Sequence, residues 1–411
     1  MAALREELVT GAPIHLGEHR ALLRRRFPEL AALAYAPAGM VQGHPETALR
    51  HTERVLARVQ SWLKDLPPDQ AQALYLAALL HDLGRGVVEP GRAAARYQHA
   101  AAPLARDVLY RLQVPPPLRD HVVYLVRHKA RPATFGRRQA ELAPMLRLAW
   151  TLNTRLLYLL AQADCLARDL PPADRRCRSI AAFRARCQEL GVFGREPPPL
   201  LSPERWAQLT PADPWLARRV AGELRFWRLK GEIETPPQAE AWLAAQRPTP
   251  AGTLYLPVGV PASGKSTWVG QHLPAAEVVS MDEMRERLTG DRRDQSQNPL
   301  VYRRCLADLR RALAAGHTVV WDAQSHTWRA RKGLLAVARD EHAYVVIVYF
   351  DVPLPVALQR NLHRQAVVPP AVIVRSYEDL EEPRPFEAEE LWRIDVDGHC
   401  TRCVASEGAG A

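Results

Sequence analysis

The sequence has little cysteine and no long run of apolar residues. Its 411 residues include six cysteines, which lack the dense spacing of a secreted disulfide-bonded scaffold. Cys400 and Cys403 form a single C-x-x-C without the second ligand pair that a structural zinc site needs. The most apolar stretch, 146–163, is interrupted by Asn153 and Arg155, and the N-terminus is charged where a signal peptide is apolar. We therefore expect a cytoplasmic protein that makes no contact with membranes.

Lysine is also scarce, although the chain is basic. Only five of the 55 basic residues are lysines, and the formal net charge is +10. A basic surface of this size favours a polyanionic partner such as nucleic acid. GC-rich coding also enriches arginine, so the charge by itself does not decide the partner. Because arginine is used almost everywhere else, a lysine inside a motif is informative.

Length and apolar spacing predict two domains of different class. The chain exceeds the size at which one hydrophobic core usually stops growing. Helical spacing punctuated by proline clusters predicts an all-α first domain, a helical bundle, over residues 1–196. A segment rich in tryptophan and arginine predicts a helical connecting module over 197–248. Short β-branched runs alternate with helical stretches over 249–398, which predicts an α/β domain with a parallel sheet. Residues 399–411 are expected to be a tail.

The α/β domain contains the phosphate-binding motif G-x-x-x-x-G-K-[ST]. The motif lies between a predicted strand, 253–258, and a predicted helix, which is the context that it requires. Its glycines let backbone N–H groups surround phosphates at a helix N-terminus, Lys265 reaches the β and γ phosphates, and the Ser266 hydroxyl binds Mg²⁺. The sequence therefore predicts an ATP and Mg²⁺ site made by Gly259, Ser263, Gly264, Lys265, Ser266 and Thr267.

The next predicted strand ends in Val279-Ser-Met-Asp282-Glu-Met-Arg285. This spacing places a carboxylate at the C-terminal end of a parallel strand, where ligands bind in such sheets. Asp282 there could accept the proton of an attacking hydroxyl, and Arg285 could hold a phosphate beside it. Asp282 could also cap the following helix, and the two roles are compatible.

Two further arginines follow the strand 344–352. Arg360 and Arg364 are four residues apart and therefore lie on one helix face, from which both could stabilise charge on a phosphoryl group in transfer. An arginine-rich chain also produces such pairs by chance.

These stretches resemble the kinase domain of the polynucleotide 5′-kinase family. The resemblance rests on GVPASGKST, SMDEMR, WDAQSHTWRARKGLL and FDVP followed by RNLHR. It implies that Asp282 is the general base, that Arg285 contacts the acceptor strand, and that Arg360 and Arg364 are lid arginines. The sequence departs from the family after Asp322, where Ala323-Gln324 replaces the more usual Thr-Asn.

The first domain carries an ordered set of histidines and aspartates on separate predicted helices. The set consists of His51, His81, Asp82, His99, His128 and Asp164. It resembles the HD superfamily, in which a helical bundle gathers such residues around divalent ions. The resemblance implies that His51, His81, Asp82 and Asp164 hold a first metal, with His99 and His128 supplying a second. Imidazole and carboxylate ligands suit manganese, iron, cobalt, nickel or zinc. Arg85 and Lys129 directly follow two of these residues and could either hold a substrate phosphate or be solvated surface charges.

The domain order resembles the bacterial HD-Pnk family of RNA end-healing enzymes. It implies removal of 2′,3′-cyclic, 2′ or 3′ phosphate from one broken end and ATP-dependent phosphorylation of the 5′-hydroxyl at the other, so that a separate ligase could seal RNA or DNA. Two alternatives stay open. One is an HD nucleotide phosphohydrolase joined to a small-molecule kinase, and the other is a nucleotide-sensing regulator.

Overall fold

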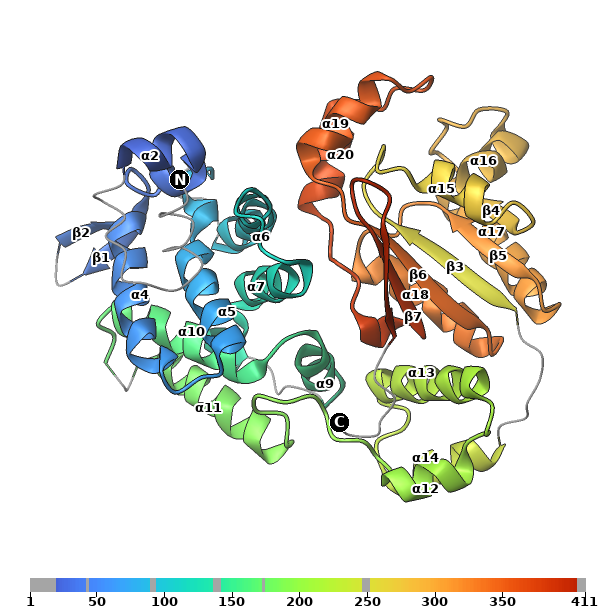
Figure 1. Ribbon diagram of the computed structural model, residues 1–411, viewed down its shortest axis with the longest axis horizontal. Coiled ribbons are helices and arrows are strands. Elements are labelled where there is room, and N and C mark those ends of the chain that lie inside the picture. Colours follow the sequence, from blue (N-terminus) through green and yellow to red (C-terminus); the bar gives the residue numbers. More distant parts are fainter. Residues whose placement is uncertain are drawn as a thin grey trace. The chain divides into compact units, whose positions relative to one another are not determined.

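The chain divides into two compact units, Met1–Pro198 and Pro199–Ala411, shown in Figure 1. The computed structural model describes residues 20–41, 44–88, 94–135, 142–171, 174–245 and 252–404. The first unit is largely helical, and the second contains a mostly parallel sheet. The predicted fold class is therefore confirmed. The segment predicted as a connecting module, 197–248, lies almost entirely in the second unit.

The first unit is built around one buried helix. Its helices are α2 (Arg20–Arg26), α3 (Pro28–Ala32), α4 (Ala48–Leu63), α5 (Pro68–Leu80), the 3-10 turn η1 (Leu83–Gly86), α6 (Ala94–Arg111), α7 (Pro116–His128), α8 (Arg131–Thr134), α9 (Leu142–Thr151), α10 (Thr154–Ala167) and α11 (Arg175–Glu189). Every residue of α5 from Ala73 to Leu80 is buried, as expected of a helix that is apolar on all sides. The residues that follow α5 therefore start inside the core.

A short hairpin in this unit was not expected from the sequence. Strands β1 (Pro37–Val41) and β2 (His44–Thr47) pair antiparallel, with an irregular register between Pro37 and Gly39. Neither strand has the alternation of apolar and polar residues that marks a half-buried strand. Thr47 then caps α4 by accepting a hydrogen bond from the Arg50 amide, so the hairpin leads directly into the helix that carries His51.

The second unit contains a six-stranded sheet in the order β4-β5-β3-β6-β7-β8. Its strands are β3 (Thr253–Val258), β4 (Glu277–Ser280), β5 (Thr318–Asp322), β6 (Tyr344–Phe350), β7 (Glu390–Ile394) and β8 (Cys400–Val404). The first five in this order are parallel, and β8 is antiparallel to β7. The four expected strands are present, whereas β7 and β8 were not anticipated. Because β8 lies inside 399–411, the segment expected to be a tail contains a strand of the sheet.

Helices pack on both faces of this sheet (Figure 1). They are α15 (Lys265–His272), α16 (Met281–Thr289), α17 (Asn298–Ala314), α18 (Trp328–Asp340), α19 (Leu354–Leu362) and α20 (Pro370–Glu378). All seven residues of β6 are buried. Val345, Ile347 and Tyr349 belong to one apolar cluster, while the residues between them belong to another. This alternation follows from the two-residue period of a strand, and it shows that the central strand is covered on both sides.

A small helical group is joined to the sheet through buried charges. It comprises α12 (Pro203–Leu209), α13 (Pro214–Lys230) and α14 (Pro236–Ala245). On α13, Glu223 pairs with His342 at 3.1 Å. A Cβ atom at Gly222 would lie 1.9 Å from the Glu389 carboxylate, so only glycine permits this close approach. Glu389 itself pairs with Arg339 at 2.6 Å, and both side chains are buried.

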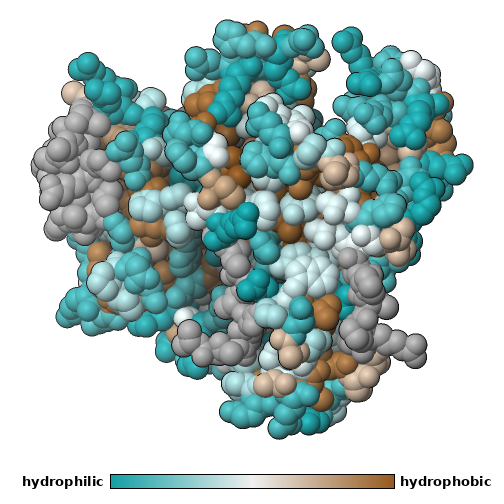
Figure 2. All heavy atoms as spheres, turned by 45° about the vertical axis from the view of Figure 1, so that its right-hand side comes forward, coloured by the Kyte–Doolittle hydropathy of each residue, from teal (hydrophilic) through white to brown (hydrophobic). Residues whose placement is uncertain are grey.

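The surface in Figure 2 is mostly hydrophilic, with apolar residues in small separate patches. Within the part of the chain that the structure describes, no helix has both the length and the apolar character needed to cross a bilayer.

A second buried ion pair holds the loops at the end of β5. Arg331 on α18 and Glu387 are joined by two hydrogen bonds, of 2.6 and 3.0 Å. The same guanidinium donates to the carbonyl oxygens of Ser325 and Glu381. Paired, planar contacts of this kind are the strong form of an ion pair.

Replacing Arg331 with methionine should lower the free energy of unfolding by about 3–5 kcal/mol, because Glu387 would remain buried without its partner. Arg310→Met is the matched control. Arg310 is half exposed and pairs with Asp340 at 3.0 Å, so its loss should change the free energy by less than about 1 kcal/mol. Urea unfolding followed by tryptophan fluorescence measures both values, and equal effects would contradict the structural role of the buried pair.

Candidate phosphate-transfer sites

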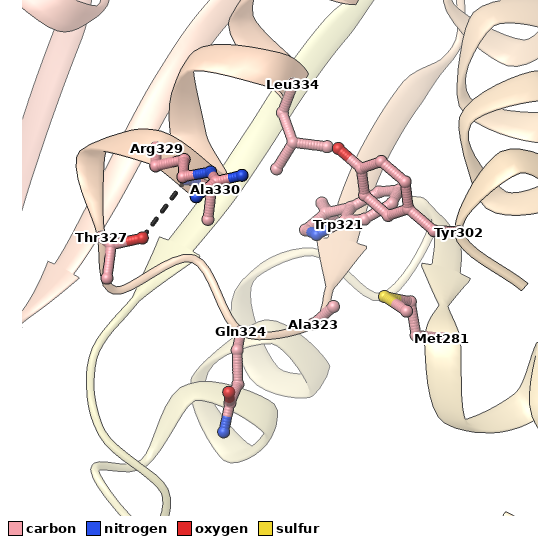
Figure 3. A pocket seen from close by; sticks show the side chains of 9 residues that line it. All are labelled: Met281, Tyr302, Trp321, Ala323, Gln324, Thr327, Arg329, Ala330 and Leu334. Atoms are coloured by element: carbon pink, nitrogen blue, oxygen red, sulfur yellow. Dashed lines mark hydrogen bonds between the residues drawn. The ribbon is translucent and has the colours of Figure 1, made fainter. Parts of the chain in front are cut away.

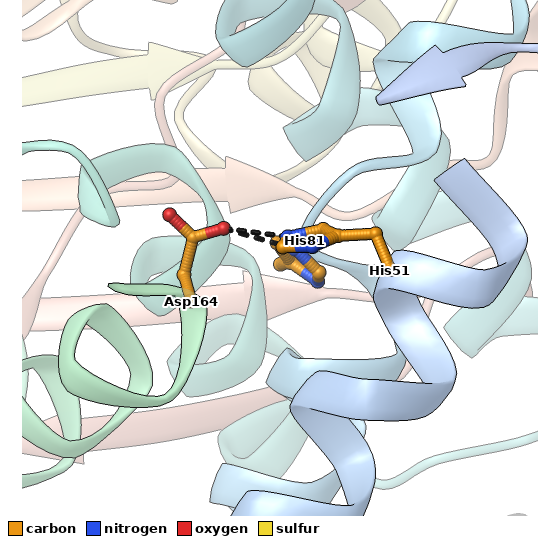
Figure 4. A group of neighbouring side chains, drawn as sticks. All are labelled: His51, His81 and Asp164. Carbon is orange, nitrogen blue, oxygen red and sulfur yellow. Dashed lines mark hydrogen bonds and ion pairs between the residues drawn. The ribbon is translucent and has the colours of Figure 1, made fainter. Parts of the chain in front are cut away.

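Three side chains from different helices meet in the first unit. His51 lies on α4, His81 directly follows α5, and Asp164 lies on α10. One ligand atom from each lies within 4.8 Å of the others, and the three side chains point toward one another in Figure 4. Both histidines are fully buried. The three residues, which the sequence analysis assigned to separate predicted helices, thus lie on or directly after three different helices that meet in the fold.

The ring of His81 offers an uncommitted lone pair to this cluster. Its Nδ1 lies 2.7 Å from the Ala78 carbonyl oxygen, and because a carbonyl can only accept, Nδ1 must carry the proton. The opposite atom, Nε2, is buried without a hydrogen-bond partner and lies 3.8 Å from Asp164 Oδ1. Burial lowers the pKa of His81 to about 3, so the ring is neutral. A neutral imidazole oriented by a backbone carbonyl is suited to hold a metal ion.

Asp164 is held in its charged form by its neighbours. Burial alone would raise its pKa, but the hydrogen bond from His51, at 2.7 Å, and the nearby guanidinium of Arg168 hold the pKa well below its usual range. Arg168 donates to Asp164 Oδ1 at 3.0 Å, and Arg176 donates to the other oxygen at 3.2 Å. Asp164 is therefore a carboxylate that stays charged among basic side chains, and it could serve as an anionic metal ligand.

Asp82 lies next to the cluster but outside the group of three. Its Oδ2 is 3.6 Å from His81 Nε2. Lys129 forms an ion pair with one oxygen, and Arg85 donates to the other at 2.7 Å. Burial opposes the charge, yet these two cations and His81 hold the pKa of Asp82 well below its usual value. The two basic residues expected to contact a phosphate thus lie at the site.

His99 and His128 are placed less closely. His99 is exposed on α6. His128, at the end of α7, stacks against Tyr124 with ring centroids 5.9 Å apart, and burial together with Arg131 and Arg127 holds its pKa well below the usual value. Neither belongs to the close group of ligand atoms found among the described residues, so their assignment to a second metal stays a prediction.

Three residues around this site were not identified from the sequence. Glu46 lies 3.7 Å from the Nδ1 atom of His51, while Arg168 and Arg176 contact Asp164. Arg168 could have been found, because it lies four residues after Asp164, at the C-terminal cap of α10. Glu46 and Arg176 come from segments whose approach only the tertiary fold reveals.

The phosphate-binding loop of the second unit follows β3 and leads into α15. Gly264 begins the helix with φ +105°, and Gly259 has φ +158°. A Cβ atom at Gly259 would lie 2.7 Å from the Ser263 hydroxyl, so the loop closes tightly only with glycine there. Ala262 also has a positive φ, +64°. Ser266 and Thr267 are exposed at the start of the helix.

Lys265 folds back over the loop. Its ammonium donates to the carbonyl oxygens of Gly259 and Val260, at 2.9 and 2.7 Å. Burial lowers its pKa to about 8, which Asp322 partly opposes and Arg364 reinforces. The charge is therefore poorly solvated, and an anionic ligand in the loop would stabilise it.

Two carboxylates lie at the ends of neighbouring strands. Ser280, the last residue of β4, pairs in register with Asp322 at the end of β5, and Asp282 follows two residues later. Loss of solvation raises the pKa of Asp322, with Asp282 contributing in the same direction and Lys265 opposing. Asp322 therefore lies close enough to both for their charges to act on it.

Asp282 is 68% exposed and forms an ion pair with Arg285. Arg285 also donates to Asn298 Oδ1 and to the Arg292 carbonyl oxygen, both at 3.0 Å, so its position is fixed. The side chain that caps α16 belongs to Ser280. The alternative that Asp282 is the helix cap was therefore wrong, and its carboxylate is left at the open end of the sheet.

Arg360 and Arg364 both lie near the loop, but only Arg360 is on α19, which ends at Leu362. The prediction that the two arginines share one helix face was therefore wrong. Arg360, on α19, donates to the carbonyl oxygens of Ser263 at 3.1 Å and Val396 at 2.6 Å. Arg364 is exposed, and its charge lowers the pKa of Lys265. The guanidinium groups of Arg360 and Arg364 thus place positive charge on the side of the loop that faces α19.

Two protein-family models match separate parts of the chain. The HD domain model matches residues 48–169, and the AAA domain model matches residues 254–383. No curated protein matches the chain. Among solved structures, a gluconokinase from Sinorhizobium meliloti 1021 is 22% identical, with a TM-score of 0.26, over 36% of this chain and 85% of that one. The native AvrRxo1-ORF1:-ORF2 complex is 16% identical, with a TM-score of 0.31, over 52% of this chain and 74% of that one.

The two matched segments coincide with the two sites. The HD match runs from the start of α4 to just after α10, so it includes the histidine-aspartate cluster. The AAA match contains the phosphate-binding loop, both strand-end carboxylates, Arg360 on α19 and Arg364 just after that helix. The chain therefore contains an HD domain followed by a P-loop domain that matches the AAA domain model.

Proposed function

We propose that this protein heals broken nucleic-acid ends. Its P-loop unit would transfer the γ-phosphate of ATP to a 5′-hydroxyl end. Its HD unit would remove a 2′,3′-cyclic, 2′ or 3′ phosphate from the opposing end, after which a separate ligase could join the two. RNA is the expected substrate, and DNA is a possible one. The net charge of +10 is consistent with a polyanionic partner.

One observation carries the proposal for the kinase. Asp282 stands exposed at the open end of the sheet, paired with a fixed Arg285, beside a loop that contains Lys265. A carboxylate with an adjacent guanidinium suits an acceptor that presents both a hydroxyl group and a phosphate. The 5′ end of a nucleic-acid strand has this combination, because the hydroxyl is followed by a phosphodiester.

The proposed transfer assigns a role to each side chain. The 5′-oxygen attacks the γ-phosphorus and its proton passes to the Asp282 carboxylate, while the bond between the γ-phosphorus and the bridging oxygen breaks and ADP leaves. Lys265 neutralises charge on the β and γ phosphates, and Ser266 is the Mg²⁺ ligand. Arg360 and Arg364 offset the charge that spreads over the transferred group.

The HD unit would act on the phosphate of the other end. His51, His81 and Asp164 fit a divalent cation, since His81 Nε2 is buried and unpartnered beside a charged carboxylate, and Asp82 lies at their edge. When bound, one or two ions of manganese, iron, cobalt, nickel or zinc would activate water and neutralise the phosphate under attack. Arg85, Lys129 and Arg168 surround the cluster and would orient the anionic ester.

An RNA with a 5′-hydroxyl and a 2′,3′-cyclic phosphate tests the proposal directly. With labelled ATP and a panel of divalent metals, the protein should label the 5′ end and open and remove the cyclic phosphate. Labelling of a sugar or another small metabolite, but of no oligonucleotide, would favour the small-molecule kinase. Binding of nucleotide without turnover at either site would favour the regulator.

Asp282→Asn should reduce the kinase kcat by about 10²–10⁴-fold, because an amide cannot accept the proton of the attacking hydroxyl. The affinity for ATP should stay within about twofold of the wild type, since Asp282 lies on the acceptor side of the loop. Asp340→Asn is the matched control, because Asp340 is 43% exposed and pairs with Arg310, which is itself half exposed. Steady-state kinetics and ATP titration measure both quantities, and an unchanged kcat in Asp282→Asn would exclude it as the base.

His81→Ala should lower the phosphatase activity by more than about a hundredfold, because even a residue that merely orients a metal ligand can contribute this much. The kinase activity of the same preparation should be unchanged. Removal of metal by a chelator should have the same selective effect, and added Mn²⁺ should reverse it.

His44→Ala is the matched control for this change, since His44 is exposed at the start of β2. The far-UV circular dichroism of both variants would show whether the helices are intact. A His81→Ala protein that is folded and fully active as a phosphatase would contradict the metal assignment.

A further inference from the structure

A pocket of about 330 Å³ opens beside the strand-end carboxylates of the second unit. It lies between the end of β5, α17 and α18 (Figure 3). Met281, which precedes Asp282, lines it on one side, and Ala323 and Gln324, which follow Asp322, line it on another. Its volume is at the lower end of the range for small-ligand pockets. No residue assigned above to ATP or to phosphate transfer lines it.

The walls of this pocket are mainly aromatic and aliphatic. Trp321 forms part of the lining and is almost fully buried. The ring of Tyr302 meets it edge to face, with centroids 6.0 Å apart. Met281 and Leu334 complete the apolar part of the lining, as Figure 3 shows. Such walls favour a flat apolar ring and are poorly suited to a polyol.

Polar groups without partners also line the pocket. The Tyr302 hydroxyl, the Gln324 amide and the Arg329 guanidinium make no hydrogen bond or ion pair with another residue in the described part of the chain. Arg329 differs in this respect from Arg331, which lies two residues farther along α18, does not line the pocket and makes hydrogen bonds to Glu387, Ser325 and Glu381. The pocket thus combines an apolar lining with an amide that can both donate and accept.

We propose that this pocket binds the 5′-terminal nucleobase of the acceptor strand and that Gln324 contacts the polar edge of the base. The inference rests on the proposed 5′-kinase function, and it adds the part of the acceptor that the enzyme recognises. In a nucleotide only the sugar separates the 5′-hydroxyl from the base. A hydroxyl at Asp282 therefore brings the base close to Met281 and Gln324.

The chemistry of the pocket matches a nucleobase. Stacking on the partly exposed ring of Tyr302 would bind any base, because every base has a π face, whereas Trp321 is too buried to be stacked on. A glutamine amide can form a pair of hydrogen bonds with one base edge, adenine above all. Arg329 is exposed at the rim, where it can meet the following phosphodiester.

Four 5′-hydroxyl oligonucleotides that differ only in the first base, and a fifth that lacks this base, test the proposal. With the wild-type enzyme, loss of the base should raise KM by roughly tenfold, as expected for the loss of one stacked base, with little change in kcat. Gln324→Ala should reduce the differences in KM among the four bases. For the oligonucleotide without the first base, Gln324→Ala and the wild type should have the same KM. Removing the base and removing the Gln324 side chain each abolish the same contact, so the second change has no further effect on it.

Gln271→Ala is the matched control, since Gln271 is exposed on α15 and does not line the pocket. It should keep the base dependence of the wild type. Equal KM values for oligonucleotides with and without the first base would overturn the pocket assignment while leaving the 5′-kinase function intact. Failure to phosphorylate any oligonucleotide would overturn both.

Discussion

The pairing of buried charge is the constraint on which both halves of this protein depend. A charged group removed from water is stable only if opposite charges and hydrogen bonds replace its hydration. In the scaffold pairs Arg331–Glu387 and Arg339–Glu389, both partners are almost completely buried. At the histidine-aspartate cluster Asp82 is buried and Asp164 is 13% exposed, whereas Arg85 and Arg176 are 23% and 46% exposed. Because Arg85 and Arg176 remain accessible to water, each could leave its carboxylate partner and bind the phosphate of a substrate instead.

The two units position their reactive groups by different means. In the first, a helix that is apolar on all sides ends just before His81, so His81 lies inside the core, and the surrounding helices bring His51 and Asp164 to it. In the second, parallel pairing aligns the ends of β4, β5 and β3, and the loop, Asp282 and Asp322 therefore share one edge of the sheet. The end-healing proposal uses both sites: the first would remove a phosphate from one end of a broken strand, and the second would phosphorylate the 5′-hydroxyl of the other end.

The sequence predicted the features that are encoded by residues close to one another along the chain. The phosphate-binding loop and the strands β3 to β6 follow from spacing within one segment, whereas the histidines and aspartates were assigned through a resemblance to the HD superfamily. It did not reveal contacts between distant segments, such as Glu46 beside His51 or Arg176 beside Asp164. With 55 basic residues, no single arginine is distinctive before the fold places it. Strands β7 and β8 escaped notice because charged residues interrupt them. Asp282 also looked like a helix cap until the structure showed that Ser280 takes this role.

Diffraction at the manganese absorption edge from crystals grown with Mn²⁺ and Mg·ADP tests the central claim most directly. The account predicts an anomalous peak within coordination distance of His51, His81 and Asp164, together with ADP phosphates cradled by the loop around Lys265. Density for both ligands would show two separate phosphate-transfer sites in one chain. No manganese between the imidazoles and the carboxylate, or nucleotide bound away from Lys265, would contradict the account.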